Sequence, residues 1–242
     1  MDSIVPHYLD NLLFFKFIKC SELVIFLVRL FMTLASSSVI ISNESFFILL
    51  MIILNCNVNF LLKNFVARPL FGFFGDYIIL LGQGTRPEGA INCGYFDTCP
   101  DKIPSSFGFP SGHSQFAGAY SGFMISQILF GQDTNHRLNE VESFQINDFI
   151  KKFYNASLHS KFSVLIHFSY ILIMMYSRVY IAGCHTIMQT IFGALIGIFI
   201  GISSNTFYRR YKSRIQRWIA AESIIFKLFL LLISCSALYS TQ

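Results

Sequence analysis

The sequence has little charge. Charged residues make up only 13% of its 242 residues, whereas 54% are hydrophobic, and the mean hydropathy is +0.56. Soluble domains of ordinary composition have about 25% charged residues. This composition therefore excludes an ordinary soluble protein of this length, and we expect the lipid bilayer to be its solvent.

Other features are missing as well. The six cysteines are scattered without the spacing of metal ligands, so no zinc site is expected. Residues 10–20 contain lysines where a signal peptide needs an uninterrupted apolar core, and we expect no cleavable signal. There is no internal repeat or low-complexity tract. We therefore treat residues 1–242 as a single integral membrane domain.

The sequence does contain long apolar runs. A helix needs about 20 mainly apolar residues to cross the hydrocarbon core of a bilayer. Six runs qualify by length and by their polar or helix-breaking boundaries: residues 23–41, 46–65, 111–130, 162–180, 186–204 and 223–239. On the fifth run Gly193, Gly197 and Gly201 recur every four residues, which indicates close helix packing. We predict an all-α, polytopic membrane bundle of about six transmembrane helices.

The charges between these runs predict the orientation. Basic residues crowd into segments 132–161 and 205–222, whereas segment 68–109 has four acidic and three basic residues. The positive-inside rule places the two basic segments in the cytoplasm and segment 68–109 on the lumenal or exoplasmic side. Cys93 and Cys99 lie in that segment, where an oxidising environment permits either a disulfide or two free thiols.

Three polar clusters lie at the edges of apolar runs, where charge is costly to place. The first is Lys63 with Arg68-Pro69, the second is segment 109–116, and the third is segment 177–189. If each run crosses the membrane once, all three clusters emerge on the same side. The topology therefore predicts that they converge on one site.

The clusters contain the residue types that phosphoryl transfer needs. The oxygens of a transferring phosphoryl group gather negative charge, which fixed cations and backbone amides stabilise. Arg68 and Arg178 offer forked donors. Ser111 and the amide of Gly112 open a helix whose N-terminus favours anions. Lys63 is a further candidate phosphate ligand, although it lies about 140° from Arg68 around an ideal helix.

In order and content, the clusters resemble the signature of the type 2 phosphatidic acid phosphatase superfamily: Lys-x6-Arg-Pro, Pro-Ser-Gly-His and Ser-Arg-x5-His-x3-Asp. Segment 110–113 matches the second part fully. Lys63 stands two positions late in the first part, and one extra residue separates Arg178 from His185 in the third. The chain looks most similar to the dolichyl diphosphatases, which share Pro-Ser-x-His-Ser-Gln-Phe and have His-Thr-x-x-Gln where relatives have an acid. The resemblance spans residues 63–201.

The resemblance implies a role for each histidine. His185 would attack phosphorus to form a phosphohistidine, His113 would protonate the leaving oxygen, and water would complete the hydrolysis. No metal or cofactor is implied. Gln189, four residues after His185 on one helix face, can hold the second ring nitrogen of the nucleophile. A second Arg-Pro pair, Arg86-Pro87, has no lysine at the family's distance, and we interpret it as a loop turn.

The expected activity is hydrolysis of a polyprenyl diphosphate such as dolichyl diphosphate, in the endoplasmic reticulum or another endomembrane. Phosphatidic acid and sphingoid phosphates remain alternative substrates, because recognition of the tail depends on the shape of an apolar groove. The shifted Lys63 and the lengthened third cluster keep a catalytically inactive lipid-binding relative open. A haloperoxidase, a channel or a transporter fits the sequence less well. The expected partners are the lipid substrate and the bilayer, with no nucleic acid, and the oligomeric state stays open.

Overall fold

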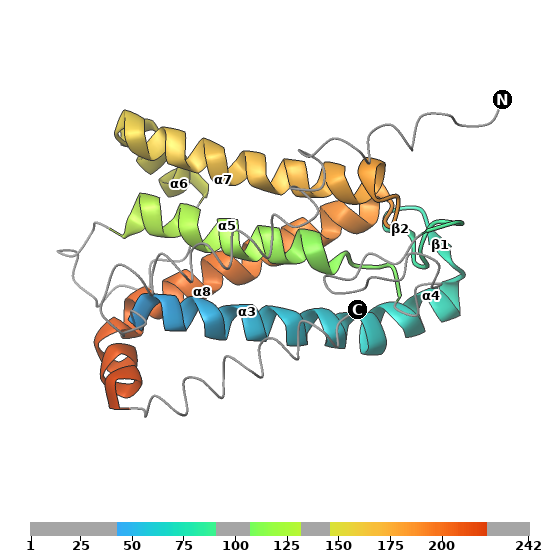
Figure 1. Ribbon diagram of the computed structural model, residues 1–242, viewed down its shortest axis with the longest axis horizontal. Coiled ribbons are helices and arrows are strands. Elements are labelled where there is room, and N and C mark those ends of the chain that lie inside the picture. The colour runs from blue at the N-terminus through green and yellow to red at the C-terminus, as the bar shows by residue number, and fades with distance from the viewer. Residues whose placement is uncertain (1–42, 91–106, 132–145, 222–242) are drawn as a thin grey trace. The chain divides into compact units, whose positions relative to one another are not determined.

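The computed structural model describes residues 43–90, 107–131 and 146–221. The chain divides into two compact units, Met1–Phe46 and Phe47–Gln242, and nearly all described residues belong to the second. That unit is mainly helical, as predicted. Its elements (Figure 1) are α3 (Asn43–Leu61), η1 (Leu62–Ala67), α4 (Arg68–Phe74), β1 (Tyr77–Ile78), β2 (Gly82–Gln83), α5 (Gly112–Phe130), α6 (Ile146–Asn155), α7 (Leu158–Tyr176), η2 (Ser177–Ile181) and α8 (Ile187–Ala221).

Three of the described helices are long and apolar enough to cross a membrane: Phe46–Phe74, Leu158–Ile181 and Ile187–Ile219. They correspond to the predicted runs 46–65, 162–180 and 186–204, each of which is longer in the structure. The predicted runs 23–41 and 223–239 lie outside the described residues. The structure therefore supports three of the six expected crossings by length and composition.

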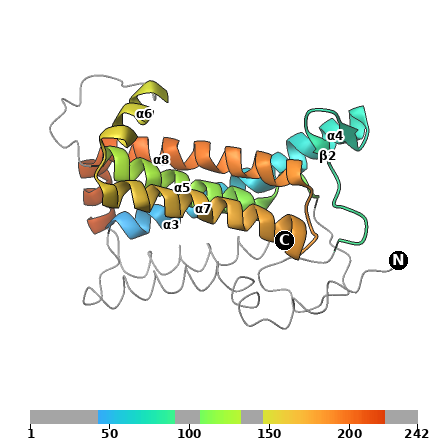
Figure 2. The same cartoon turned by 90° about the horizontal axis from the view of Figure 1, so that it is seen from above.

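The predicted run 111–130 forms α5, which falls outside those three because it is rich in serine, glycine and glutamine. Figures 1 and 2 both show α5 among α3, α7 and α8. More than half of its residues are buried, including Ser114, Gln115 and Ser121. Small and polar residues of this kind allow membrane helices to pack closely and to form hydrogen bonds with one another. The polarity of α5 thus fits the centre of a bundle.

Helix α5 packs most extensively against α8. The regularly spaced glycines of α8 make this approach possible, as the sequence predicts. A Cβ atom at Gly193, Gly197 or Gly201 would overlap the backbone carbonyl oxygen of Ser111, Gln115 or Ala119, respectively. This packing fixes the first turns of α8 against the first turns of α5, and it thereby brings the second and third polar clusters together.

The outward faces of the long helices are apolar. Leu165, Ile166 and Leu172 on α7 are among the exposed residues, and so are Leu54 on α3 and Phe199 on α8. Large apolar surfaces of this kind are unfavourable in water and favourable against hydrocarbon. The distribution therefore fits an integral membrane protein.

Helix α8 separates two ends of unit 2. Its 35 residues begin beside the third polar cluster and cover about 50 Å, with a kink at Tyr211 (φ −111°, ψ 17°). The basic residues of segment 209–217 lie on its distal part. In Figures 1 and 2 the distal part of α8 and helix α6 lie at one end, whereas α4 and the β1–β2 hairpin lie at the other.

Candidate active site

The residues expected to act together come from the starts and ends of four different helices. Lys63 lies in η1 at the end of α3, and Arg178 lies in η2 at the end of α7. Ser111, Gly112 and His113 begin α5, His185 lies two residues before α8, and Gln189 lies in the first turn of α8. These termini meet at the end of unit 2 that carries the hairpin (Figure 1).

His185 has the geometry of an oriented nucleophile. It is 3% exposed, and its Nδ1 atom lies 3.0 Å from Oε1 of Gln189. An amide oxygen only accepts hydrogen bonds, so Nδ1 carries the hydrogen and Nε2 keeps its lone pair. The structure thus contains the contact between His185 and Gln189 that their spacing predicts.

The surroundings of His185 keep it neutral. Its pKa lies well below the ordinary histidine value, first because burial disfavours the charged imidazolium. The positive charges of Arg86 and Lys63 lower the pKa further, and Arg178 acts in the same direction. The hydrogen bond that His185 donates to Gln189 opposes these effects and raises the pKa of His185. A neutral imidazole is the form that can attack phosphorus.

The second cluster forms the N-terminus of α5. Ser111 is the N-cap, and its Oγ accepts a hydrogen bond from the backbone N–H of Ser114 at 3.5 Å. The backbone N–H of Ser111 donates to the carbonyl oxygen of Gln189 at 3.0 Å, which ties the second cluster to the third. His113 is buried, and Arg178 and Lys63 lie close enough to act on it electrostatically. The N-terminus of α5, where Gly112 is the first helical residue, suits an anion.

The first cluster differs from its expected arrangement. Lys63 is 6% exposed and lies near both histidines, whereas Arg68 is exposed. The two residues are joined by a π-helical turn, in which the backbone N–H of Arg68 donates to the carbonyl oxygen of Lys63. Their five-residue separation turns them to different sides, so a buried Lys63 leaves Arg68 outside the site. The expectation that Arg68 joins the phosphate ligands is not supported by this placement.

The extra residue of the third cluster is accommodated without separating Arg178 from His185. Segment η2 is π-helical, and the backbone N–H of Ala182 donates to the carbonyl oxygen of Ser177 at 2.8 Å. Gly183 then adopts a positive φ of 60°, which favours glycine. π-Helical turns take up an extra residue and are frequent at functional sites. His185 therefore remains beside Arg178 despite the longer spacing.

Cys184 immediately precedes His185 and is disulfide-bonded. Cys56 is free and buried. Cys93 and Cys99, for which the sequence leaves a disulfide and two free thiols open, lie outside the described residues.

Arg86 is a site residue that the sequence interpretation missed. It is half-buried, and its Nη1 donates to the carbonyl oxygen of Cys184 at 3.4 Å, directly before His185. Burial and the positive charge of Arg178 lower the pKa of Arg86 to about 10. Arg86-Pro87 does lie at a loop turn, in which the backbone N–H of Ala90 donates to the carbonyl oxygen of Pro87 at 3.0 Å, but the sequence interpretation did not anticipate the contact of the Arg86 side chain with Cys184. The sequence does offer a signal for Arg86, because Arg86-Pro87 is a second Arg-Pro pair ahead of Pro-Ser-Gly-His. This pair lies much farther from Lys63 than the signature requires, so it was not assigned to the first cluster.

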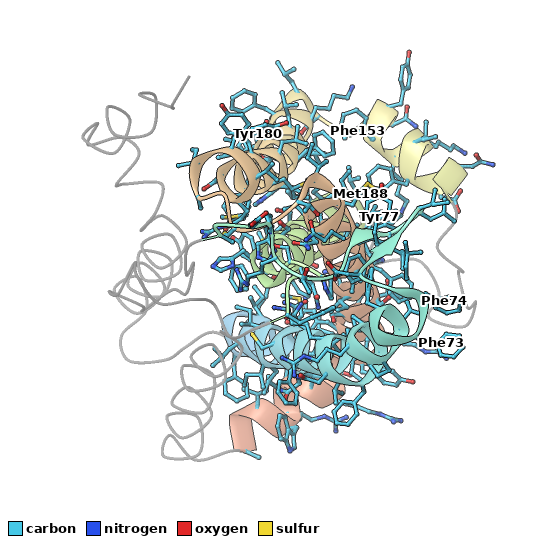
Figure 3. The ribbon with its side chains drawn as sticks, turned by 90° about the vertical axis from the view of Figure 1, so that its right-hand side faces the viewer. Phe73, Phe74, Tyr77, Phe153, Tyr180 and Met188 are labelled. Atoms are coloured by element: carbon cyan, nitrogen blue, oxygen red, sulfur yellow. The ribbon has the colours of Figure 1, made fainter. Side chains whose placement is uncertain are left out.

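A short loop delivers Arg86. It starts at Asp76, whose carboxylate accepts hydrogen bonds from the backbone N–H and hydroxyl of Thr85 at 2.8 and 2.5 Å. The β1–β2 hairpin lies between these two residues, with Tyr77 paired to Gln83. The hairpin packs against the start of α8, where Met188 lies beside it (Figure 3).

The fold and the site define a class: a helical membrane bundle with two histidines and several cations at the ends of its helices. The family model of the PAP2 superfamily matches residues 44–214, and the chain belongs to this superfamily. Its members are generally phosphatases, so membership supports a lipid-phosphatase type of function. No curated protein and no solved structure matches the chain.

Proposed function

We propose that this protein hydrolyses a lipid phosphate or diphosphate through a phosphohistidine on His185. The observation that carries the proposal is a buried, neutral His185 whose Nδ1 is held by Gln189, with Lys63 and Arg178 close by. An imidazole with a free Nε2 lone pair beside fixed cations suits attack on an anionic phosphoryl group.

The reaction has two steps. In the first, the Nε2 lone pair of His185 forms a bond to phosphorus, and the bond between phosphorus and the leaving oxygen breaks. In its protonated form, His113 supplies the proton that this oxygen takes up. Lys63, Arg178 and the amides at the start of α5 stabilise the charge on the remaining phosphoryl oxygens. In the second step, water attacks phosphorus and gives one proton to His113, and the P–N bond breaks. Inorganic phosphate leaves, with His185 neutral and His113 protonated again.

The favoured substrate is a polyprenyl diphosphate such as dolichyl diphosphate. Its support is the resemblance of segments 110–116 and 185–189 to dolichyl diphosphatases. Gln115 of the first segment accepts a hydrogen bond from Nδ2 of Asn59 at 2.7 Å and so connects α5 to α3. Ile79 and Leu80 at the hairpin tip are 87% and 78% exposed. Apolar residues next to a cationic site suit a substrate with a phosphate head and a hydrocarbon tail.

The site is proposed to face the lumen or the cell exterior. The basic part of α8 lies at the opposite end from the hairpin, and basic ends of membrane helices remain in the cytoplasm. The disulfide of Cys184 beside His185 also supports an oxidising compartment such as the endoplasmic reticulum lumen.

The test is phosphate release by the full-length protein in detergent with EDTA present. Dolichyl diphosphate, phosphatidic acid and sphingosine phosphate are compared as substrates. We expect release from the diphosphate to fall at least about a thousandfold in His185→Ala, because the nucleophile is lost. The matched control is His159→Ala, which removes an exposed histidine on the first turn of α7.

A ³²P-labelled substrate should also leave acid-labile radioactivity on wild-type protein and none on His185→Ala. Folded protein that releases phosphate from none of the three lipids would contradict the proposal and favour the lipid-binding alternative.

A further inference from the structure

Gln189 uses every hydrogen-bonding position of its side-chain amide. Oε1 lies 3.0 Å from Nδ1 of His185 and accepts from the backbone N–H of Thr186 at 3.2 Å. Nε2 donates to the carbonyl oxygens of Gln83 and Thr85, at 2.9 and 2.6 Å. An amide offers two donor hydrogens and two acceptor positions. Gln189 is fully buried, so each of the four contacts satisfies a group that water cannot reach.

The amide is also fixed in place from its own helix. The backbone N–H of Gln189 donates to the hydroxyl of Thr186 at 3.4 Å, and Thr186 donates in return to Oε1. This reciprocal pair is a capping box, which anchors the first turn of a helix. Gln189 therefore connects the start of α8 to the nucleophile on one side and to the hairpin loop on the other.

A carboxylate could make only half of these contacts. Glutamate accepts hydrogen bonds and has no donor when ionised. At position 189 it could still hold His185 and Thr186, but its second oxygen would face the carbonyl oxygens of Gln83 and Thr85. The carboxylate oxygen and the two carbonyl oxygens would repel one another, and a buried oxygen without a hydrogen-bond donor lowers the stability of the fold. The glutamine thus serves the loop as well as the histidine.

The loop held by Gln189 is the one that carries Arg86. Arg86 directly follows Thr85, and its carbonyl oxygen accepts from Nε2 of Gln83 at 3.4 Å. Gly108 closes the loop from the other side, because a Cβ there would come within 2.7 Å of Nε2 of Gln189 and 2.8 Å of the carbonyl oxygen of Thr85. The backbone that leads into Arg86 is therefore fixed on both sides, and its guanidinium reaches the carbonyl of Cys184.

We propose that Arg86 binds the phosphate of the substrate, and that Gln189 is the positioning residue that holds Arg86 beside His185. The inference rests on the proposed phosphate chemistry of this site. The guanidinium of Arg86 provides a planar fork that suits two phosphate oxygens. Arg68, the arginine that the signature indicates, is exposed and does not compete for this place.

Binding of orthovanadate, a phosphate mimic, tests the role of Arg86 without requiring turnover. Titration calorimetry of the full-length protein in detergent should show a Kd that rises about 10- to 100-fold in Arg86→Gln, because a charged hydrogen-bond donor is lost. Arg68→Gln should cause a smaller rise. Arg214→Gln on the exposed part of α8 serves as the control and should bind like wild type. A larger loss in Arg68→Gln than in Arg86→Gln would overturn the assignment.

A double-mutant cycle tests the positioning role of Gln189. Gln189→Glu should weaken vanadate binding, and Arg86→Gln should add less than its single effect in the double variant, because both changes remove the same contact. A purely structural defect at position 189 would leave the two effects additive. Additive losses would therefore overturn the positioning role.

Comparison with lipid hydrolysis separates this inference from the proposed function. Vanadate binding that depends on Arg86, in a protein that hydrolyses no lipid phosphate, would support the inference and contradict the function. Hydrolysis that is as fast in Arg86→Gln as in Arg214→Gln would overturn the inference and leave the function intact.

Discussion

The chain contains two Arg-Pro pairs whose surroundings differ. Arg68 begins α4, where the side chain is exposed, and Figure 3 shows Phe73 and Phe74 on the outer side of the same helix. Arg86 follows a loop that is tied to Asp76 on one side and to Gln189 on the other. The same dipeptide is therefore a surface helix start in one region and a part of the site in the other. What separates them is the backbone in front of each arginine, which continues a helix before Arg68 and forms a loop held by Gln189 before Arg86.

The largest expected effect is the loss of activity when each of the two arginines is replaced in turn. Arg86→Ala should lower kcat/KM about 100-fold, because the phosphate loses a charged, forked donor in a buried site. Arg68→Ala should lower it much less. Initial rates with the substrate that the protein prefers measure both. Equal losses in the two variants would mean that the two regions share the phosphate.

The next largest expected effect is a loss of activity when a glycine in the loop before Arg86 is replaced by alanine. A Cβ at Gly84 would overlap the rings of Phe71 and Phe107, whereas a Cβ at Gly72 on α4 meets nothing within 4 Å. Gly84→Ala should therefore displace the loop and lower kcat/KM by about tenfold or more, since small misplacements in an active site are costly. Gly72→Ala is the matched control and should retain the activity and thermal stability of wild type. Normal activity of Gly84→Ala would show that the loop moves freely.

Removal of Asp76 should have a smaller effect. Asp76→Ala leaves Thr85 without two hydrogen bonds, but the bond from Gln189 remains. Because Gln189 still holds the carbonyl oxygen of Thr85, we expect only a small displacement of Arg86 and a loss of up to about tenfold, seen mainly in KM. A fall in kcat with an unchanged KM would instead place Asp76 in the chemical step.

The smallest expected effect is a shift of the pH profile. Because the pKa of His185 lies below its ordinary value, wild-type kcat/KM should hold below pH 6.5 and decline only as His185 becomes protonated. Gln189→Glu places a negative charge beside Nδ1, which favours the imidazolium and raises the pKa. The acidic limb of the profile should therefore move to higher pH in this variant. An unmoved limb would show that Gln189 does not tune His185.

Parts of the site could be read from local sequence. His113, His185 and Gln189 stand next to residues that fix their geometry, because Pro110 and Ser111 begin α5 and Thr186 caps α8. The regular glycines of α8 likewise predicted close helix packing, which the structure confirms and shows to be with α5. Such features depend on neighbours within one or two helical turns, so spacing along the chain is enough to find them.

The first cluster could not be read in this way. Lys63 seemed misplaced relative to Arg68, yet it is Lys63 that enters the site. Ideal helix spacing places Lys63 and Arg68 on different sides of the helix, but it does not decide which of the two is buried beside the histidines. Arg86 reaches the site through a loop whose path depends on contacts with a helix far along the sequence.

The sequence by itself determined that the protein is an apolar helical membrane protein, and its short motifs predicted His113 and His185 as the reacting residues. Composition, the length of apolar runs and short motifs are local properties, so they can be recognised without knowledge of the tertiary contacts. The tertiary structure alone showed that Arg86 lies near His185 in addition to Arg178, and that Arg68 is exposed. The loop before Arg86 accepts hydrogen bonds from the amide of Gln189, and these bonds can form only when α8 and the hairpin pack together.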